Sequence, residues 1–136
     1  MAATFRTSRL IEFGDTDMAG IVHFTRFFHF MESAEHALLR SLGLSVVTEW
    51  DGVRISFPRV SASCDYLRPV RFEDVLTVDV AVKKLGRASV TYAFEFARDG
   101  EAVARGQITT VCCRTDTSRL EAHPIPEGIR TKLAGG

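Results

Sequence analysis

The sequence predicts an α+β fold in which an antiparallel sheet of five or six strands wraps around one long central helix. Apolar residues recur at helical spacing in one long segment, residues 24–42. After this segment they alternate with polar residues through four further segments between residues 53 and 114. A long helix with one apolar side must bury that side, and a sheet that wraps around the helix is the simplest way to do so.

Before the helix, Thr4 to Phe13 mixes apolar and charged residues in loose alternation and is expected to form the first strand. It runs into the loop 12–24, EFGDTDMAGIVHF, which carries two aspartates, Asp15 and Asp17, ahead of the helix. Acidic residues in such a place usually cap free backbone N–H groups or form turns. A carboxylate close to free N–H donors is also half of an acyl-transfer site, in which it acts as base or nucleophile beside an oxyanion hole.

The helix is expected from Phe24 to Leu42, with Gly43 placed to end it. Its polar side carries a narrow stripe that includes His29 and His36. These histidines are seven residues apart, whereas a helical zinc pair needs a spacing of about four residues, so the stripe predicts no metal site. The apolar residues on the other side are Phe24, Phe27, Met31, Ala34, Leu38 and Leu42.

The alternating segments after the helix are residues 53–66, 75–84, 88–97 and 102–114. We expect the strand 53–66 to bend or break near Pro58, because proline cannot donate to a sheet ladder. Between the last two strands, Arg98-Asp99-Gly100-Glu101 is typical of a hairpin, since Asp-Gly accepts the positive φ angles of a type I′ turn.

Residues 1–136 are expected to form a single domain, with a core of about residues 4–115 and a weakly structured tail, 116–136. Lys and Arg together number 17, as do Asp and Glu, so no net charge favours a nucleic acid or a membrane surface as partner. No apolar run is long enough to span a bilayer, and the N-terminus lacks an apolar signal core. The odd count of three cysteines predicts reduced thiols and a cytoplasmic location rather than a disulfide framework.

The run Asp15-Thr16-Asp17-Met18-Ala19-Gly20-Ile21-Val22-His23-Phe24, followed by a helix that carries Glu32, resembles the signature of hotdog-fold acyl-CoA thioesterases. Within that fold it is similar to the 4-hydroxybenzoyl-CoA thioesterase branch. The resemblance extends from about Arg9 to Arg114 and includes Phe57-Pro58. It implies an enzyme that hydrolyses a coenzyme A thioester without metal or organic cofactor. It also implies a homodimer or homotetramer with active sites at the subunit interface.

The resemblance assigns roles to particular residues. Asp17 corresponds to the catalytic aspartate, and the backbone N–H of Phe24 corresponds to the oxyanion donor. Glu32 corresponds to the acid that lines the acyl pocket, and Arg87, with Lys84 close by, best matches the basic residues near the CoA phosphates. This chain departs from the family at the start of the helix, where members often carry a tyrosine. A backbone donor survives that change, but a contact through the tyrosine hydroxyl does not.

Other residues keep two interpretations. His23 could line the acyl pocket or simply pack at the start of the helix, whereas Asp15 is expected to cap or brace the loop. By helical angle Glu35 lies within the apolar half of the helix and Glu32 lies on its flank. A carboxylate on an apolar face is costly unless it is paired or hydrated, so either residue could contact a ligand. For Glu35 we favour the alternative, a salt bridge across a subunit interface.

The sequence therefore predicts a thioesterase acting on an aromatic or short acyl-CoA, such as 4-hydroxybenzoyl-CoA or 1,4-dihydroxy-2-naphthoyl-CoA. Asp17 would serve either as nucleophile or as a base that orients water. One alternative is release of acyl groups from acyl carrier protein. Another is a non-catalytic hotdog module that binds acyl-CoA, against which the presence of Asp17 argues.

Overall fold

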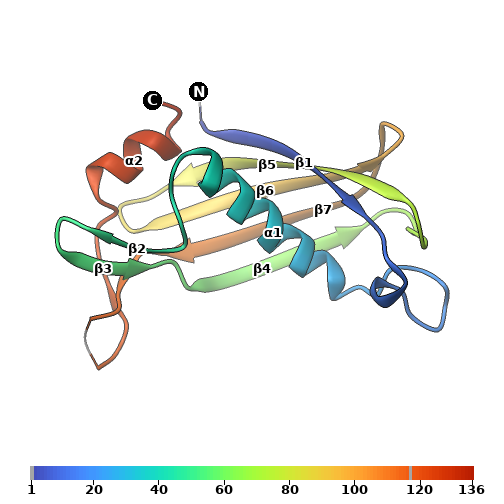
Figure 1. The fold of residues 1–136 in the computed structure, drawn as a ribbon, viewed down its shortest axis with the longest axis horizontal. Helices are drawn as coiled ribbons and strands as arrows, with labels where there is room; N and C mark the ends of the chain where they lie inside the picture. Colours follow the sequence, from blue (N-terminus) through green and yellow to red (C-terminus); the bar gives the residue numbers. More distant parts are fainter. Residues whose placement is uncertain (1, 117) are drawn as a thin grey trace.

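A five-stranded antiparallel sheet packs against one long helix, α1 (Arg26–Ser41) (Figure 1). The computed structural model describes residues 2–116 and 118–136; Met1 and Thr117, the latter within the predicted tail, lie outside the described residues. In spatial order the strands of the sheet are β1 (Thr4–Leu10), β5 (Val75–Leu85), β6 (Ser89–Arg98), β7 (Glu101–Val111) and β4 (Arg59–Tyr66). The predicted α+β architecture, with one long helix on an antiparallel sheet, is confirmed.

A second, four-stranded sheet lies at one end of the molecule (Figure 1). Its strands, in spatial order, are β2 (Val47–Trp50), β3 (Val53–Ser56), β8 (Cys113–Arg114) and β9 (Glu121–Ala122). The predicted strand 53–66 is therefore two strands in different sheets, separated at Phe57-Pro58, where proline interrupts the ladder. The predicted last strand is likewise divided, because Cys112 leaves the ladder between β7 and β8.

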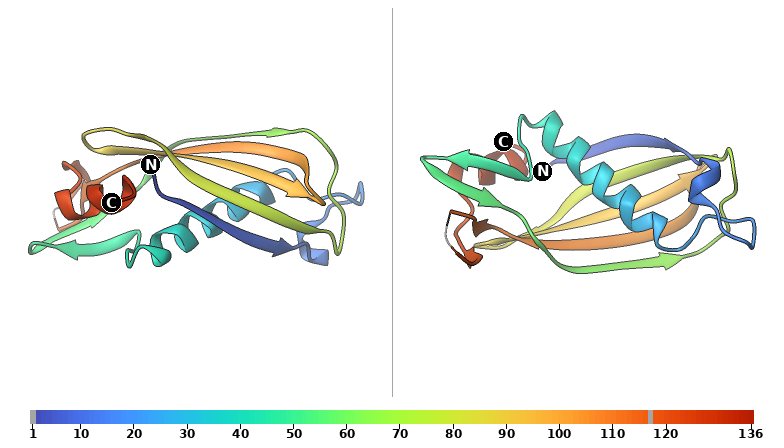
Figure 2. Two further views of the ribbon diagram at one scale, coloured as in Figure 1. Left: turned by 90° about the horizontal axis from the view of Figure 1, so that it is seen from above. Right: turned by 60° about the horizontal axis from the view of Figure 1, so that its bottom comes forward.

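The core lies between α1 and the inner face of the large sheet (Figures 1 and 2). Alternate residues of β5 and β6 are buried, as the sequence predicts. On β7, Gly106 allows the helix to approach, because a Cβ at this position would overlap the sulfur of Met31. The buried side chains of α1 are Phe27, Phe30, Met31, Ala34, Glu35, Leu38 and Leu39.

The hairpin predicted at Asp99-Gly100 is confirmed, with φ angles of 51° and 79° at these two residues. The expectation of a weakly structured tail is wrong. The tail contains β9 and the helix α2 (Glu127–Leu133), and the side chains of Ile125, Ile129 and Leu133 are buried. These three apolar residues are spaced four apart, so one side of a short helix can be buried against the sheet.

The three cysteines are free thiols, of which Cys112 and Cys113 are buried and Cys64 is partly buried. Burial raises the pKa of Cys112 to about 11. It also raises the pKa of Cys64 to about 11, against a lowering effect of Tyr66. All three side chains are therefore shielded from solvent to some degree, and the thiols of Cys64 and Cys112 are protonated near neutral pH.

The two ends of the large sheet carry different features (Figures 1 and 2). One end holds the loop 12–24, including the short 3-10 helix η1 (Phe13–Asp15), and the segment 67–74. The other end holds the turn between β5 and β6, the small sheet and α2. In the part of the chain that the structure describes, no helix is both long and apolar enough to cross a membrane.

Candidate active site

Asp17 stands in a tight turn of the loop between β1 and α1. Its Oδ1 accepts a hydrogen bond from the Ala19 N–H at 2.9 Å, and its carbonyl accepts one from the Gly20 N–H at 2.9 Å. Gly20 has a φ of 78°, a conformation that glycine adopts without strain. The Asp17 N–H donates to the carbonyl of Ile21 at 2.9 Å, which closes the loop. The main chain thus fixes the Asp17 side chain, which remains exposed.

Asp15 braces the same loop, as predicted. It is 1% exposed, and its carboxylate accepts hydrogen bonds from the Glu12 N–H at 2.9 Å and from Arg26 Nε at 3.0 Å. Arg9 approaches the same carboxylate at 3.5 Å. Burial alone would raise the pKa of Asp15, but the Glu12 N–H and the two arginines outweigh it and hold the pKa below its usual value. Asp15 is therefore an ionised structural group that joins β1, the loop and α1.

The N–H groups at the start of α1 are only partly used. The His23 N–H donates to the Asp15 carbonyl at 2.9 Å, and the Thr25 N–H donates to His23 Nδ1 at 3.3 Å. Between them, the Phe24 N–H has no acceptor among residues 2–116 and 118–136. A free N–H at the positive end of a helix dipole stabilises negative charge, so Phe24 can serve as an oxyanion donor.

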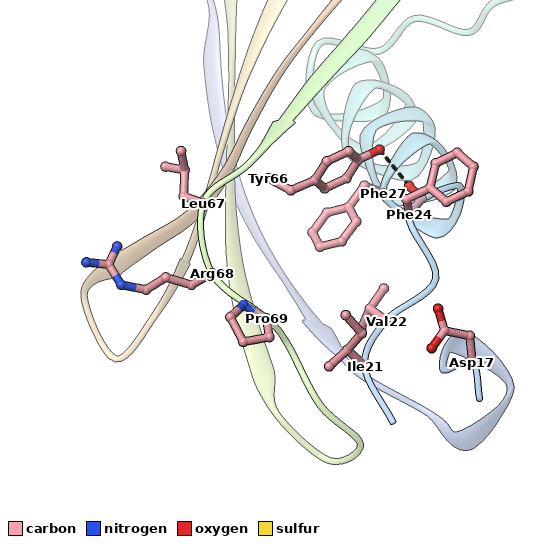
Figure 3. Close-up of a pocket in the computed structure, with 9 residues that line it drawn as sticks. All are labelled: Asp17, Ile21, Val22, Phe24, Phe27, Tyr66, Leu67, Arg68 and Pro69. Atoms are coloured by element: carbon pink, nitrogen blue, oxygen red, sulfur yellow. Dashed lines mark hydrogen bonds between the residues drawn. The ribbon is translucent and has the colours of Figure 1, made fainter. Parts of the chain in front are cut away.

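A pocket of about 440 Å³ brings Asp17 and Phe24 together (Figure 3). Its wall is largely apolar and includes Ile21, Val22, Phe27, Tyr66, Leu67, Arg68 and Pro69. The guanidinium of Arg68 points away from the pocket (Figure 3) and forms an ion pair with Glu101 at 2.9 Å. The pocket thus offers a carboxylate, a free N–H and aromatic rings in one place.

Tyr66 is a site residue for which the sequence predicts no role. It lies at the end of β4, and its hydroxyl donates to the Phe24 carbonyl at 2.9 Å (Figure 3). Burial raises the pKa of this hydroxyl, with Cys64 adding to the effect, so the group stays protonated at neutral pH. Residue 66 and residue 24 are far apart in the sequence, so only the sheet topology reveals their contact.

The other predicted site residues lie outside this pocket within one protomer. The His23 ring stacks on Phe24, with ring centroids 4.8 Å apart, and its Nδ1 lies 2.7 Å from Thr25 Oγ1. Glu32 is exposed on α1, and its Oε2 lies 3.9 Å from Arg59 Nη2. Lys84 and Arg87 are exposed near the turn between β5 and β6, at the opposite end of the sheet (Figure 1).

Glu35 is fully buried, and the expectation that it pairs across a subunit interface is wrong. Its Oε1 accepts a hydrogen bond from Arg59 Nη2 of the same chain at 2.7 Å. Its Oε2 has no hydrogen-bond partner among the described residues. Burial raises the pKa of Glu35 to about 7, although Arg59 opposes this effect. The side chain of Arg59 also lies 3.3 Å from His36 Nε2, and burial together with Arg59 lowers the pKa of His36.

Residues 11–133 match the family model of the thioesterase-like superfamily. The chain belongs to the thioesterase-like superfamily. A relative from Synechococcus sp. strain WH7803, named 1,4-dihydroxy-2-naphthoyl-CoA hydrolase, is 30% identical over 96% of this chain and 91% of its own length. The family model therefore covers α1, the strands β2 to β9 and α2, and begins directly after β1.

Solved structures of two named thioesterases share this fold. A gentisyl-coenzyme A thioesterase is 28% identical, covers 96% of this chain and 100% of its own, and superposes with a TM-score of 0.84. The 4-hydroxybenzoyl-CoA thioesterase from Pseudomonas sp. strain CBS-3 is 24% identical, covers 95% of this chain and 99% of its own, and has a TM-score of 0.81. The hotdog fold expected from the loop 12–24 is thereby confirmed.

Proposed function

We propose that this protein hydrolyses an aromatic acyl-CoA thioester, with Asp17 as the catalytic carboxylate and the Phe24 N–H as the oxyanion donor. The observation that carries the proposal is that both residues line one largely apolar pocket, Asp17 with an exposed carboxylate and Phe24 with a free N–H at the start of a helix. Acyl transfer needs both groups, one to deliver or activate the nucleophile and one to stabilise the oxyanion.

In the proposed reaction the thioester carbonyl oxygen lies against the Phe24 N–H. Asp17 either attacks the carbonyl carbon, to form an anhydride that water then cleaves, or takes a proton from a water molecule that attacks in its place. In both routes negative charge builds on the carbonyl oxygen next to the start of α1, where the helix dipole stabilises it. As this charge collapses back, the C–S bond breaks and the CoA sulfur leaves as thiolate. In the base route this step gives the free acid directly; in the nucleophilic route it gives the anhydride, which water then cleaves to release the acid and restore Asp17.

The pocket wall supports an aromatic acyl group. Phe24, Phe27 and Tyr66 line it, and aromatic rings pack favourably against one another at offset or edge-to-face geometry. The chain's relatives include a hydrolase named for 1,4-dihydroxy-2-naphthoyl-CoA and a thioesterase named for gentisyl-coenzyme A. Both of these CoA thioesters carry aromatic acyl groups. We therefore expect hydroxylated aryl-CoA thioesters to be better substrates than long-chain acyl-CoAs.

We also propose that the working enzyme is a homodimer joined through β4. Within the described part of the chain, β4 pairs with β7 on one side and has no partner strand on the other. Unpaired edge strands are templates for pairing with another chain. A two-fold axis near the middle of β4 would place the partner's sheet beside this one with its two ends exchanged. The partner's turn between β5 and β6, with its Lys84 and Arg87, would then come to the end that carries this pocket, which supports a role for both residues at the CoA phosphates.

The test is a thiol-release assay with wild type and Asp17→Asn over aryl-, short- and long-chain acyl-CoAs and an aryl thioester of acyl carrier protein. We expect an aryl-CoA to be the best substrate and Asp17→Asn to lower kcat by about 10²–10⁴-fold, the usual worth of a positioned acid or base. Asp51→Asn, an exposed aspartate in the turn between β2 and β3, is the matched control and should leave kcat unchanged.

The possible results distinguish the proposed function from its alternatives. Equal rates for wild type and Asp17→Asn would refute the catalytic role of Asp17. Turnover of the carrier-protein thioester alone would identify the acyl carrier protein as the substrate's carrier. Binding of acyl-CoA without turnover of any thioester would favour the non-catalytic module.

A further inference from the structure

We propose that Tyr66 is a positioning residue: its hydroxyl anchors the Phe24 carbonyl and so limits the movement of Phe24, the residue that carries the free N–H. This inference rests on the proposed function, because it concerns the same oxyanion donor. It adds a residue from β4, on the sheet, to a site that otherwise depends on the loop 12–24 and the first turn of α1.

The first turn of α1 does not hold Phe24 by itself. The Arg26 N–H donates to the His23 carbonyl at 2.9 Å, and the Phe28 N–H donates to the Thr25 carbonyl at 3.1 Å. Both bonds join residues three apart, and neither has the Phe24 carbonyl as its acceptor. That carbonyl instead accepts the hydrogen bond of the Tyr66 hydroxyl at 2.9 Å.

Tyr66 is itself held in place, so it can transmit the position of the sheet to the helix. Its backbone pairs with Ala104 of β7, and its ring packs edge-on against Phe27 with centroids 5.3 Å apart. Phe27 in turn packs edge-on against Phe96 of β6 at 5.3 Å. The hydroxyl is thus the polar tip of a packed aromatic row that runs from the sheet to the first turn of α1.

The hydrogen bond from Tyr66 compensates for the weak anchoring of Phe24 at the start of the helix. Phe24 is 59% exposed, so its own side chain anchors it poorly. The side chain of the neighbouring His23 is occupied by Thr25 and by the Phe24 ring. A hydroxyl from β4 therefore fixes the backbone from across the pocket. An oxyanion donor must be held close to its productive geometry, since small displacements weaken transition-state stabilisation.

The first test is Tyr66→Phe, which keeps the ring against Phe27 and removes the hydroxyl. We expect kcat on the best aryl-CoA to fall about tenfold, the effect of one lost hydrogen bond, while KM stays within about twofold. A thioether analogue of the substrate lacks the carbonyl and cannot use the Phe24 N–H, so its Kd should not change. The matched control is Tyr92→Phe, which removes the hydroxyl of the chain's other tyrosine. Tyr92 is buried in the core, so this change should leave kcat unchanged.

The second test does not depend on activity. In ¹⁵N relaxation of the free protein, we expect the Phe24 amide of the wild type to have the order parameter of rigid backbone, about 0.85, and that of Tyr66→Phe to fall toward 0.6. Equal kcat values and equal order parameters would overturn the positioning role even if Asp17→Asn is inactive. A drop in the order parameter would support that role even if the wild type hydrolyses no thioester. A parallel weakening of thioether binding would instead indicate a general collapse of the pocket and would overturn it.

Discussion

Glu32 and Glu35 lie one turn apart on α1, yet their carboxylates are in opposite environments. Glu32 is exposed to solvent, whereas Glu35 is fully buried against Arg59 with one oxygen unpaired. Desolvation disfavours the charged form of a carboxyl group, and a single arginine offsets only part of that penalty. The pKa of Glu35 is therefore raised from the usual value for glutamate to about 7.

This raised pKa predicts a pH-dependent stability. Between about pH 4.5 and 7 the folded state binds more protons at Glu35 than the unfolded state, so its contribution to stability decreases as the pH rises. The difference amounts to about 3 kcal/mol at most. Glu35→Gln should remove this slope in urea unfolding measured from pH 4.5 to 8. The lowered pKa of His36 gives a slope of opposite sign, so the quantity to compare is wild type minus variant.

Glu49→Gln is the control for this measurement, because it changes an exposed carboxylate of β2 that, unlike Glu32, is not among the charges that act on Glu35. Its stability profile should follow that of the wild type. If the profile of Glu35→Gln also follows the wild type, the carboxyl of Glu35 is ionised in both states and the stated direction of its pKa is wrong.

At the scale of secondary structure, periodicity predicts the long elements and misses the short ones. The helix and the strands β5 and β6 are long enough for their apolar spacing to be unambiguous. The four residues of β2 carry no such pattern, and its strand is defined by pairing with β3. The apolar spacing of α2 is present in the sequence, but the neighbouring prolines and the glycine-rich end favour the prediction of an unstructured tail.

The same distinction applies to the site. A continuous motif suggested Asp17 and Phe24, and the structure places both in one pocket. Tyr66 reaches the site through the pairing of β4 with β7, which the sequence does not encode as a local pattern. The partner of Glu35 was missed for the same reason, because Arg59 is brought to α1 by the start of β4.

The burial of α2 predicts a measurable contribution to stability. Ile129 is 2% exposed, so Ile129→Ala should lower the free energy of unfolding by about 2–4 kcal/mol, as for other buried large-to-small changes. Thr131→Ala changes an exposed residue of the same helix and should stay within about 0.5 kcal/mol of the wild type. Equal stabilities for the two variants in urea unfolding would mean that α2 does not pack on the sheet in solution.

At the scale of the whole molecule, the two edges of the large sheet differ in what they expose. The edge strand β1 is marked by charged side chains, and its Arg6 forms an ion pair with Asp79 of β5. The central part of β4 instead exposes Ser61, Ala62 and Ser63, which are small and uncharged. Charged side chains protect an edge strand from pairing, whereas small uncharged ones allow it. This contrast supports β4 as the dimer edge.

A dimer joined at β4 is tested by placing a charge on that edge. In a two-fold pair a residue near the centre of β4 lies close to its own copy, so Ser63→Lys brings two like charges together and should raise the dimer Kd about fivefold or more. Ser8→Lys makes the same change on β1 and should leave the Kd unchanged. Sedimentation equilibrium gives both values, and equal Kd values for the two variants would exclude β4 as the interface.

The shielded thiols have a practical consequence for enzymology. A chromogenic disulfide reagent that reports free CoA reacts through thiolates, and Cys64 and Cys112 hold almost none near neutral pH because their pKa values are about 11. Cys113 is buried as well. The native enzyme will therefore add little background colour to a continuous assay. Under denaturing conditions the three cysteines become reactive, and the same reagent then times the loss of native structure.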